Sequence, residues 1–292
     1  MEKLYRVCPG LSPRKEGDRI PFKREGTCMP KPFILLTNDD GYLSSGLLAL
    51  RNALVDLGEV WVLAPDRNWS AASRTRIFHK PLRVSTVKLP GGEEVRITNG
   101  SPSDCVSLAL LGLAPRRPDL VLAGINSGAN LGRDVTLSGT VAAAMEAAEE
   151  GIPAIAVSLD VGEELGENPP DYSHAARIAA QLAAFVLTEK PLKPGTLLNV
   201  NVPRGTPRGI RFTRLGSKLY RDELVRGTDP RGREYYWLSG EMLSEPPPGG
   251  EDTDVWALLS GYVSITPLQL DLTAYPVLEA LREYEDILNL GE

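Results

Sequence analysis

The chain has 292 residues, which is enough for one large α/β domain, and its 42% hydrophobic and 24% charged residues are ordinary for a globular protein. Its net charge of -6 argues against a general nucleic-acid-binding role, and no apolar run reaches the length of a membrane span. Cys8, Cys28 and Cys105 have no paired or metal-type spacing, which favours a reducing cytoplasm. The sequence has two histidines, His79 and His174, so it gives little support for a histidine-based zinc site or a Ser-His-Asp triad.

The first 28 residues are basic and polar, contain three prolines and show no periodicity. We therefore expect residues 1–28 to form a loosely ordered extension. Met29 stands just before the first apolar run, so residues 29–292 are expected to form a single domain.

The first apolar run, 33–36, predicts a buried parallel strand, and it ends in Thr37-Asn38-Asp39-Asp40-Gly41. Open α/β sheets bind their ligands at the carboxyl ends of strands. Side chains next to each other on a strand point to opposite faces, so Asp39 and Asp40 can converge on one ion only beyond the strand's end. Gly41 permits the turn that this requires.

The next segments repeat the pattern of a strand followed by a polar loop. Leucines between 47 and 57 recur with helical spacing before Gly58, and 60–64 predicts a second strand. The loop after that strand contains Ser70. Residues 82–87 and 94–98 predict a hairpin, and 105–113 a helix capped by Ser101 or Ser103.

Residues 118–123 predict another buried strand, followed by the glycine-rich loop Gly124-Ile-Asn-Ser-Gly-Ala-Asn-Leu-Gly132. Its glycines allow a ligand to approach the backbone closely, and Asn126 offers an amide oxygen. Ser138-Gly139-Thr140 then opens an alanine-rich helix. Hydroxyls and free N–H groups at that helix N-terminus suit a phosphate.

The remaining segments complete an α/β pattern. Strands are predicted at 153–159 and 197–202, with a helix at 173–187 between them. This alternation predicts a doubly wound, mostly parallel sheet. Beyond residue 203 we expect β segments at 210–214, 234–238 and 262–265 with long polar connections, as in hairpins that contact another subunit, and a final helix at 277–288.

Three loops, expected at the same edge of this sheet, offer oxygen ligands for a metal site. The candidate ligands are Asp39 and Asp40, then Ser70 or Ser73, and Asn126. A donor set of oxygens without His or Cys selects Mg²⁺ or Mn²⁺. Such an ion beside a glycine-rich loop and a helix N-terminus forms a phosphate site.

These motifs resemble those of the SurE family of metal-dependent nucleotide phosphatases. The motifs that carry the resemblance run in order along the chain and occupy 36–41, 64–70, 98–106, 124–135, 138–146, 231–237 and 261–268. This chain departs from the family's usual pattern at Ala71, Asn99 and Leu137, where Gly, Asp and an aromatic residue are common.

The resemblance implies a Rossmann-like core with a C-terminal β-hairpin extension. It also implies 5'- and 3'-nucleotidase activity on nucleoside monophosphates, sometimes activity on polyphosphate, and homodimers or homotetramers built through hairpins within 204–275. One divalent ion per subunit is expected on Asp39, Asp40, Ser70 and Asn126, and Asp39, Asp40 and Asn126 are the expected catalytic residues. The expected phosphate and substrate contacts are Asn38, Asn99, Ser101, Ser127, Gly128, Ser138, Gly139 and Thr140.

Three alternatives to hydrolysis differ in how well they fit the sequence. A non-catalytic nucleotide-binding module stays open, because a phosphate cradle binds as readily as it reacts. An aspartyl-phosphate mechanism is disfavoured, because Asn38 occupies the nucleophile's position in the Asp-x-Asp-Gly register. An NAD-type oxidoreductase is disfavoured, because no G-x-G-x-x-G follows the first strand. Whether Asp39 acts as nucleophile, base or ligand alone is left open.

Overall fold

The computed structural model describes residues 30–89, 91–162, 170–217, 220–242 and 250–288. The chain divides into two units, Met1–Pro30 and Lys31–Glu292, and the second contains the elements described below. The expected N-terminal extension, 1–28, lies outside the described residues.

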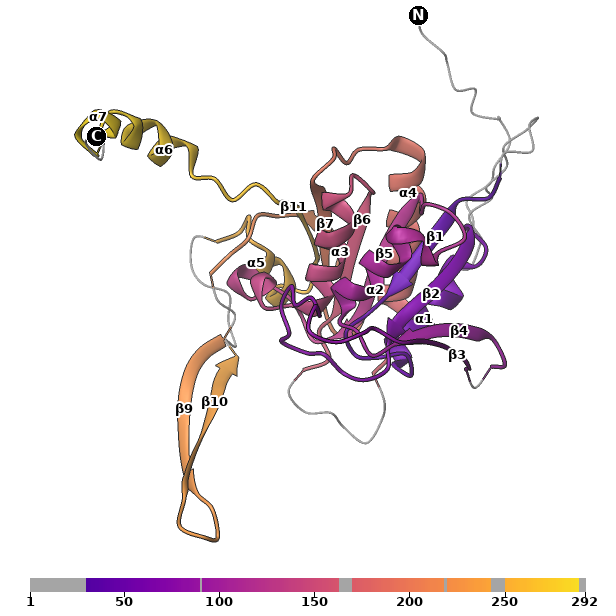
Figure 1. The fold of residues 1–292 in the computed structure, drawn as a ribbon, viewed down its shortest axis with the longest axis horizontal. Helices are drawn as coiled ribbons and strands as arrows, with labels where there is room; N and C mark the ends of the chain where they lie inside the picture. Colours follow the sequence, from indigo (N-terminus) through magenta and orange to yellow (C-terminus); the bar gives the residue numbers. More distant parts are fainter. Residues whose placement is uncertain (1–29, 90, 163–169, 218–219, 243–249, 289–292) are drawn as a thin grey trace, which may run out of the picture. The chain divides into compact units, whose positions relative to one another are not determined.

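A nine-stranded sheet forms the centre of the second unit, with strand order β3-β4-β2-β1-β5-β6-β7-β11-β8 (Figure 1). Its strands are β1 (Phe33–Thr37), β2 (Glu59–Pro65), β3 (Val84–Lys88), β4 (Glu94–Thr98), β5 (Leu120–Ser127), β6 (Ala154–Leu159), β7 (Thr196–Val202), β8 (Ile210–Phe212) and β11 (Val263–Gln269). The strands from β4 to β7 in this order run parallel, whereas β3 and β11 are antiparallel to their neighbours β4 and β7. The expected doubly wound, mostly parallel sheet is confirmed.

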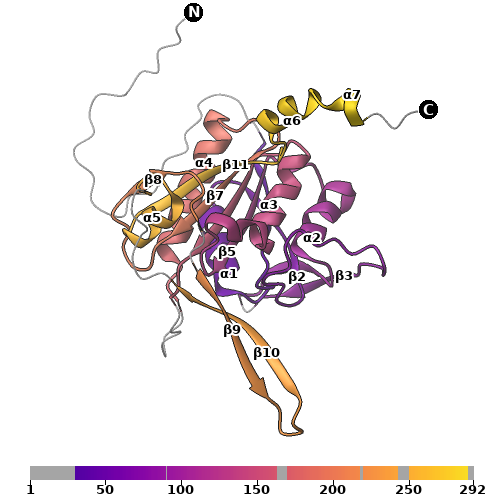
Figure 2. The same ribbon diagram turned by 90° about the vertical axis from the view of Figure 1, so that its left-hand side faces the viewer.

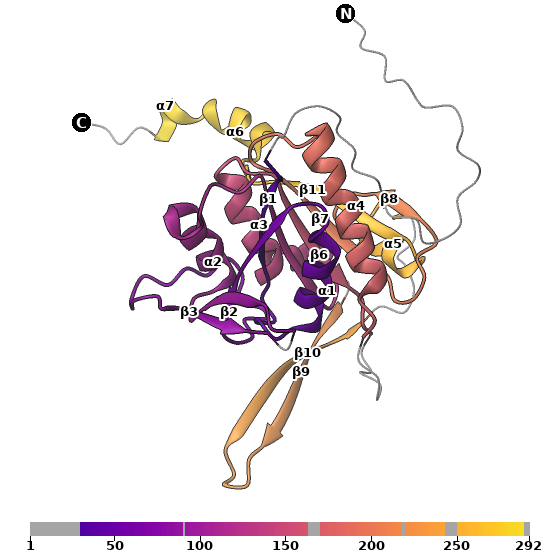
Figure 3. The same ribbon diagram turned by 90° about the vertical axis from the view of Figure 1, so that its right-hand side faces the viewer.

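Two layers of helices cover the sheet, as the opposite views of Figure 2 and Figure 3 show. One face packs against α1 (Ser45–Leu54) and α4 (Ser173–Glu189), and the other against α2 (Pro102–Leu108) and α3 (Gly139–Glu149). Alternate residues of β1 enter the two cores, because successive strand side chains point to opposite faces. Since β1 pairs with β2 on one side and with β5 on the other, the strand order reverses at β1 and creates the switch point where such sheets bind ligands.

Several expected boundaries were wrong. Helix α1 ends at Leu54, because the N–H groups of Leu57 and Gly58 both bond to the Leu54 carbonyl in a closing turn. Helix α2 begins at Pro102, because Ser101 caps it, and residues 109–113 form a π-helical turn, η1 (Ala109–Leu113). Strand β5 continues through Ser127, past the residue at which the glycine-rich loop was expected to begin.

The C-terminal part contains the expected β-hairpin extension and two elements that were not expected. The hairpin is a separate antiparallel pair of strands, in which β9 (Tyr220–Thr228), not expected as a strand, pairs with β10 (Glu234–Met242). Helix α5 (Asp254–Leu259), which precedes β11, was not expected either. The expected final helix is two helices, α6 (Tyr275–Arg282) and α7 (Glu285–Leu288). In the part of the chain that is described, no helix is both long and apolar enough to cross a bilayer.

Candidate functional site

The candidate site lies at the carboxyl ends of β1, β2 and β5, beside the switch point of the sheet. Asp39 and Asp40 follow β1, Ser70 lies on the loop that follows β2, and Asn126 lies near the end of β5. Parallel neighbouring strands end at one edge, so these residues belong to one region of the sheet.

The Asp39 carboxylate is buried at the N-terminus of α3, where the side chain is only 3% exposed. The Thr140 N–H donates to its Oδ2 at 3.2 Å, and the Thr140 hydroxyl donates to its Oδ1. Gly139 allows this approach, because a Cβ there would lie 2.9 Å from the Asp39 Cβ. Burial, the largest cause, and the charge of Asp40 together raise the pKa of Asp39 to about 6, against the lowering effect of the Thr140 hydrogen bonds.

The neighbouring carboxylate, Asp40, turns toward β5. Its Oδ2 accepts a hydrogen bond of 3.1 Å from the Ser127 N–H, and burial raises the pKa of Asp40 above its usual value. Within the described ranges, neither Asp39 nor Asp40 forms an ion pair with Lys, Arg or His. Two adjacent, largely buried carboxylates without a cationic side chain therefore form a site that favours a bound cation.

The turn after β1 packs directly on the loop after β2. Gly41 has a φ of +94°, and a Cβ at this position would lie 3.1 Å from the Arg67 carbonyl carbon. The Trp69 N–H donates to the Asp39 carbonyl at 2.7 Å, so Ser70, the next residue, is held close to the Asp39 backbone. Ser70 is exposed, and its hydroxyl forms no hydrogen bond with the described residues.

Asn126 stands on β5 beyond an irregularity in the strand, where the register against β6 shifts between Ala123 and Asn126. The shift occurs at Gly124, whose φ is +129° and where a Cβ would lie 2.2 Å from the Val157 carbonyl oxygen. Asn126 Nδ2 donates to the Gly128 carbonyl at 2.8 Å. Its Oδ1 receives no hydrogen bond from the residues that are described, so this oxygen remains available to a ligand.

Most of the expected substrate contacts already make internal hydrogen bonds. Ser138 caps α3 by accepting the Val141 N–H at 3.1 Å, and Ser101 caps α2 in a capping box with Asp104. Asn99 Oδ1 accepts the Arg83 N–H at 2.8 Å.

Two further expected contacts, Asn38 and Gly128, lie in the same region. Asn38 Nδ2 donates to the Gly41 carbonyl at 2.9 Å, while Asn38 Oδ1 is buried and has no hydrogen-bond partner in the described part of the chain. The Gly128 N–H is already bonded to the Leu159 carbonyl at 2.9 Å, so it is not free for a phosphate.

A polar clamp that was missed from the sequence holds the glycine-rich loop at Asn130. Asn201 Oδ1 accepts the Asn130 N–H at 2.7 Å, and the Nδ2 atoms of Asn199 and Asn201 donate to the Asn130 carbonyl at 2.8 and 3.0 Å. The Asn130 side chain donates in turn to Ser158 Oγ at 2.8 Å. The signal was present as asparagines alternating with aliphatic residues in β7, which places two amides on one face of a buried strand.

Asp254, at the start of α5, anchors the same loop from another side. Its Oδ2 accepts the Gly132 N–H at 2.8 Å and its Oδ1 the Gly216 N–H at 2.7 Å. Burial raises the pKa of Asp254, and these N–H groups oppose that effect. The glycine-rich loop is thus fixed by residues far apart in the sequence.

The comparisons with known proteins find one family throughout. The model of the family described as Survival protein SurE matches residues 34–222. A 5'-nucleotidase SurE from Chloroflexus aggregans is 50% identical over 257 residues, which cover 87% of this chain and 99% of the relative. One from Herpetosiphon aurantiacus is 52% identical over 243 residues, covering 82% and 93%. The crystal structure of the Sure protein from Aquifex aeolicus aligns with a TM-score of 0.74 at 41% identity, covering 87% of this chain and all of that one.

Proposed function

This chain belongs to the SurE family, and from that premise we propose that it is a metal-dependent 5'-nucleotidase, which hydrolyses nucleoside 5'-monophosphates to nucleosides and phosphate. The observation that carries the proposal is the pair of adjacent carboxylates at the switch point, those of buried Asp39 and half-buried Asp40, which form no ion pair with a cationic side chain in the described part of the chain. Relatives of nearly full coverage bear the name 5'-nucleotidase. Hydrolysis of 3'-monophosphates and of short polyphosphate is part of the proposal.

The ion is held, in this proposal, by Asp39, Asp40, the Ser70 hydroxyl and Asn126 Oδ1. These are hard oxygen donors, and two of them carry no other hydrogen bond with the described residues, which fits Mg²⁺ or Mn²⁺. When bound, such an ion supplies charge that stabilises the phosphoryl oxygens and lowers the pKa of a coordinated water.

The phosphate is oriented by the N-terminus of α3 and the neighbouring end of β5. The Gly139 N–H forms no hydrogen bond with the described residues, and the dipole of α3 favours an anion at this end of the helix. Thr140 holds Asp39 in place beside it, because both its hydroxyl and its N–H are committed to that carboxylate. Ser127 holds Asp40 through its backbone N–H. The chain thus positions substrate and carboxylates together, which is the main contribution that a protein makes to phosphoryl transfer.

The decisive experiment is phosphate release from 5'-AMP by the purified protein, first with EDTA and then with Mn²⁺ or Mg²⁺ restored. We expect release only with the ion, and its loss in Asp40→Ala. Asp56→Ala, the same change at an exposed aspartate after α1, is the matched control and should keep full activity. Confirmed Mn²⁺ binding without release from any nucleoside monophosphate would favour the non-catalytic binding module instead.

The proposal includes assembly into homodimers or homotetramers through the β9–β10 hairpin. The hairpin pairs only with itself among the described strands, and Trp237 and Leu238 on it are 66% and 91% exposed. Apolar side chains gathered on an exposed strand pair are typical of a surface that another chain covers.

A further inference from the structure

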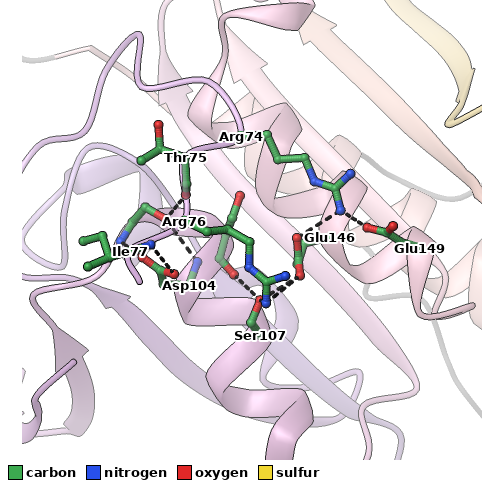
Figure 4. Close-up of polar contacts among 10 residues, drawn as sticks. Arg74, Thr75, Arg76, Ile77, Asp104, Ser107, Glu146 and Glu149 are labelled. Atoms are coloured by element: carbon green, nitrogen blue, oxygen red, sulfur yellow. Dashed lines mark hydrogen bonds and ion pairs between the residues drawn. The ribbon is translucent and has the colours of Figure 1, made fainter. Parts of the chain in front are cut away.

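Helix α3 carries a buried acid, Glu146, one turn after Ala142 and Ala143. The residue is 5% exposed, and its carboxylate meets three polar groups (Figure 4). Oε2 lies 3.1 Å from the Arg74 guanidinium, while Oε1 accepts from the Ser107 hydroxyl at 2.7 Å and lies 3.5 Å from Arg76. A buried carboxylate is costly unless it is paired in this way, so Glu146 holds its partners firmly.

Both arginines belong to the loop between β2 and β3, the loop that also carries Ser70. Two backbone N–H groups of this loop are bonded to other segments, one just before α3 and one on α2. Ser73 donates its N–H to the Leu137 carbonyl at 3.0 Å, and the Ile77 N–H donates to Asp104 Oδ1 at 3.2 Å. Arg74 and Arg76, the residues before and after Thr75 in the sequence, both contact Glu146 (Figure 4). Glu146 is therefore the one described carboxylate that contacts both arginines of residues 73–77, beside the separate contacts of Arg76 with Ser107 and of Arg74 with Glu149.

The same helix thus acts on two proposed metal ligands. Its first turn holds Asp39 through Thr140, and Glu146, further along the helix, holds the loop of Ser70. We propose that Glu146 is a positioning residue that fixes Ser70 relative to Asp39 through Arg74 and Arg76, and so sets the affinity for the divalent ion. This inference rests on the proposed metal site.

Glu146→Gln isolates this role. The amide keeps the shape of the side chain and can still accept from Ser107, but it removes the charge that attracts the arginines. Arg74 and Arg76 have side chains that are 36% and 38% exposed, and they keep Glu149 and Ser107 as partners, so neither charge is stranded once the carboxylate of Glu146 is gone. No unpaired charge is left buried, and the fold should be retained. The matched control is Glu149→Gln, because exposed Glu149 pairs with Arg74 alone.

The test is a calorimetric Mn²⁺ titration of the wild type, Glu146→Gln, Ser70→Ala and the double variant. We expect Glu146→Gln to weaken binding by about tenfold, in the range of residues that orient metal ligands. In the Ser70→Ala background the same change should weaken binding by less than about twofold, because Glu146 is proposed to affect the ion only through the position of Ser70. Glu149→Gln should bind as the wild type does. Wild-type affinity in Glu146→Gln, or an equal loss with and without Ser70, would overturn the inference.

Hydrogen exchange of the metal-free protein supplies a readout that does not depend on the ion. The Ser73 and Ile77 amides should exchange faster in Glu146→Gln, whereas the amides of β1 and β5 should not change. Unchanged exchange at Ser73 and Ile77 would overturn the anchoring role even if the metal site is correct. Faster exchange there in a protein without any Mn²⁺ affinity would instead refute the proposed metal site and leave Glu146 as a loop anchor only.

Discussion

Thr140 donates both its hydroxyl and its backbone N–H to the two oxygens of Asp39, across 101 positions of sequence. This pair joins the end of β1 to the N-terminus of α3 and fixes the orientation of the carboxylate. The helix dipole adds to the effect, since an anion at the first turn of a helix is favoured.

Replacing Thr140 by Val removes the hydroxyl and keeps the backbone N–H and the branched shape. Without the hydroxyl, Asp39 loses one of its two fixed contacts, so we expect the affinity for Mn²⁺ to fall by about tenfold. Calorimetric titration measures this. Thr136→Val is the control, because exposed Thr136 donates only to the Arg133 carbonyl. Equal affinity in the two variants would contradict the orienting role.

The stability of the metal-free protein should depend on the protonation of Asp39. Burial raises the pKa of this group from 3.8 to about 6 in the folded state, so the folded state holds the proton more tightly than the unfolded state. The resulting stabilisation is complete below about pH 4 and is lost as the pH rises through about 6. Urea unfolding in EDTA between pH 4 and 7 should show this decline, with a smaller slope in Asp39→Asn. An equal slope in the variant would contradict the assignment.

Much of this site could be predicted from residues alone, because short apolar runs ending in polar residues locate the strand ends. Parallel strands then bring those ends to one edge, which is why Asp39, Asp40 and Asn126 were found as a group. Local signals were less reliable at boundaries. Asn126 was expected on a loop, but β5 continues through it by way of a register shift at Gly124.

The missed features have physical reasons. Strand β9 has many charged residues and lacks an apolar alternation, since it forms an isolated hairpin without a buried face. Helix α5 has only 6 residues, too few for a helical pattern to stand out in the sequence. Its N-cap, Thr253, is a residue type that is common at this position, and its Oγ1 accepts the Trp256 N–H. The partners of Glu146 and Asn130 come from distant segments, and no local pattern specifies such long-range contacts.

The thiol of Cys105 should be inert. Cys105 is fully buried in α2, and burial raises its pKa far above the usual range of a thiol, so almost no reactive thiolate forms. In a Cys8→Ser/Cys28→Ser variant, a disulfide reagent at pH 8 should titrate no thiol in the native protein and one in denaturant. Rapid reaction of the native variant would contradict this prediction.

The β9–β10 hairpin should control assembly. Replacing the exposed residues Trp237 and Leu238 by Ser removes apolar area that another subunit is proposed to cover. We expect light scattering after size exclusion to show a smaller species than the wild type. The control, Leu111→Ser, changes a similarly exposed leucine in η1 and should leave the mass unchanged. A wild-type mass in the hairpin variant would exclude this surface from the interface.

The stability of the protein should depend on the hydrogen bond that Asn201 Nδ2 donates to the Asn130 carbonyl. In Asn201→Asp, the donor to the Asn130 carbonyl becomes a carboxylate oxygen in a fully buried position, so an uncompensated charge faces a carbonyl dipole. We expect a loss of about 3 kcal/mol in the free energy of unfolding at pH 7, typical of a buried group left without its partner. Protonation restores a donor, so the loss should shrink as the pH falls toward 5. Asn52→Asp, at an exposed position on α1, should change stability little at either pH. Urea unfolding distinguishes the two, and a small, pH-independent effect at Asn201 would show that the clamp does not bear on stability.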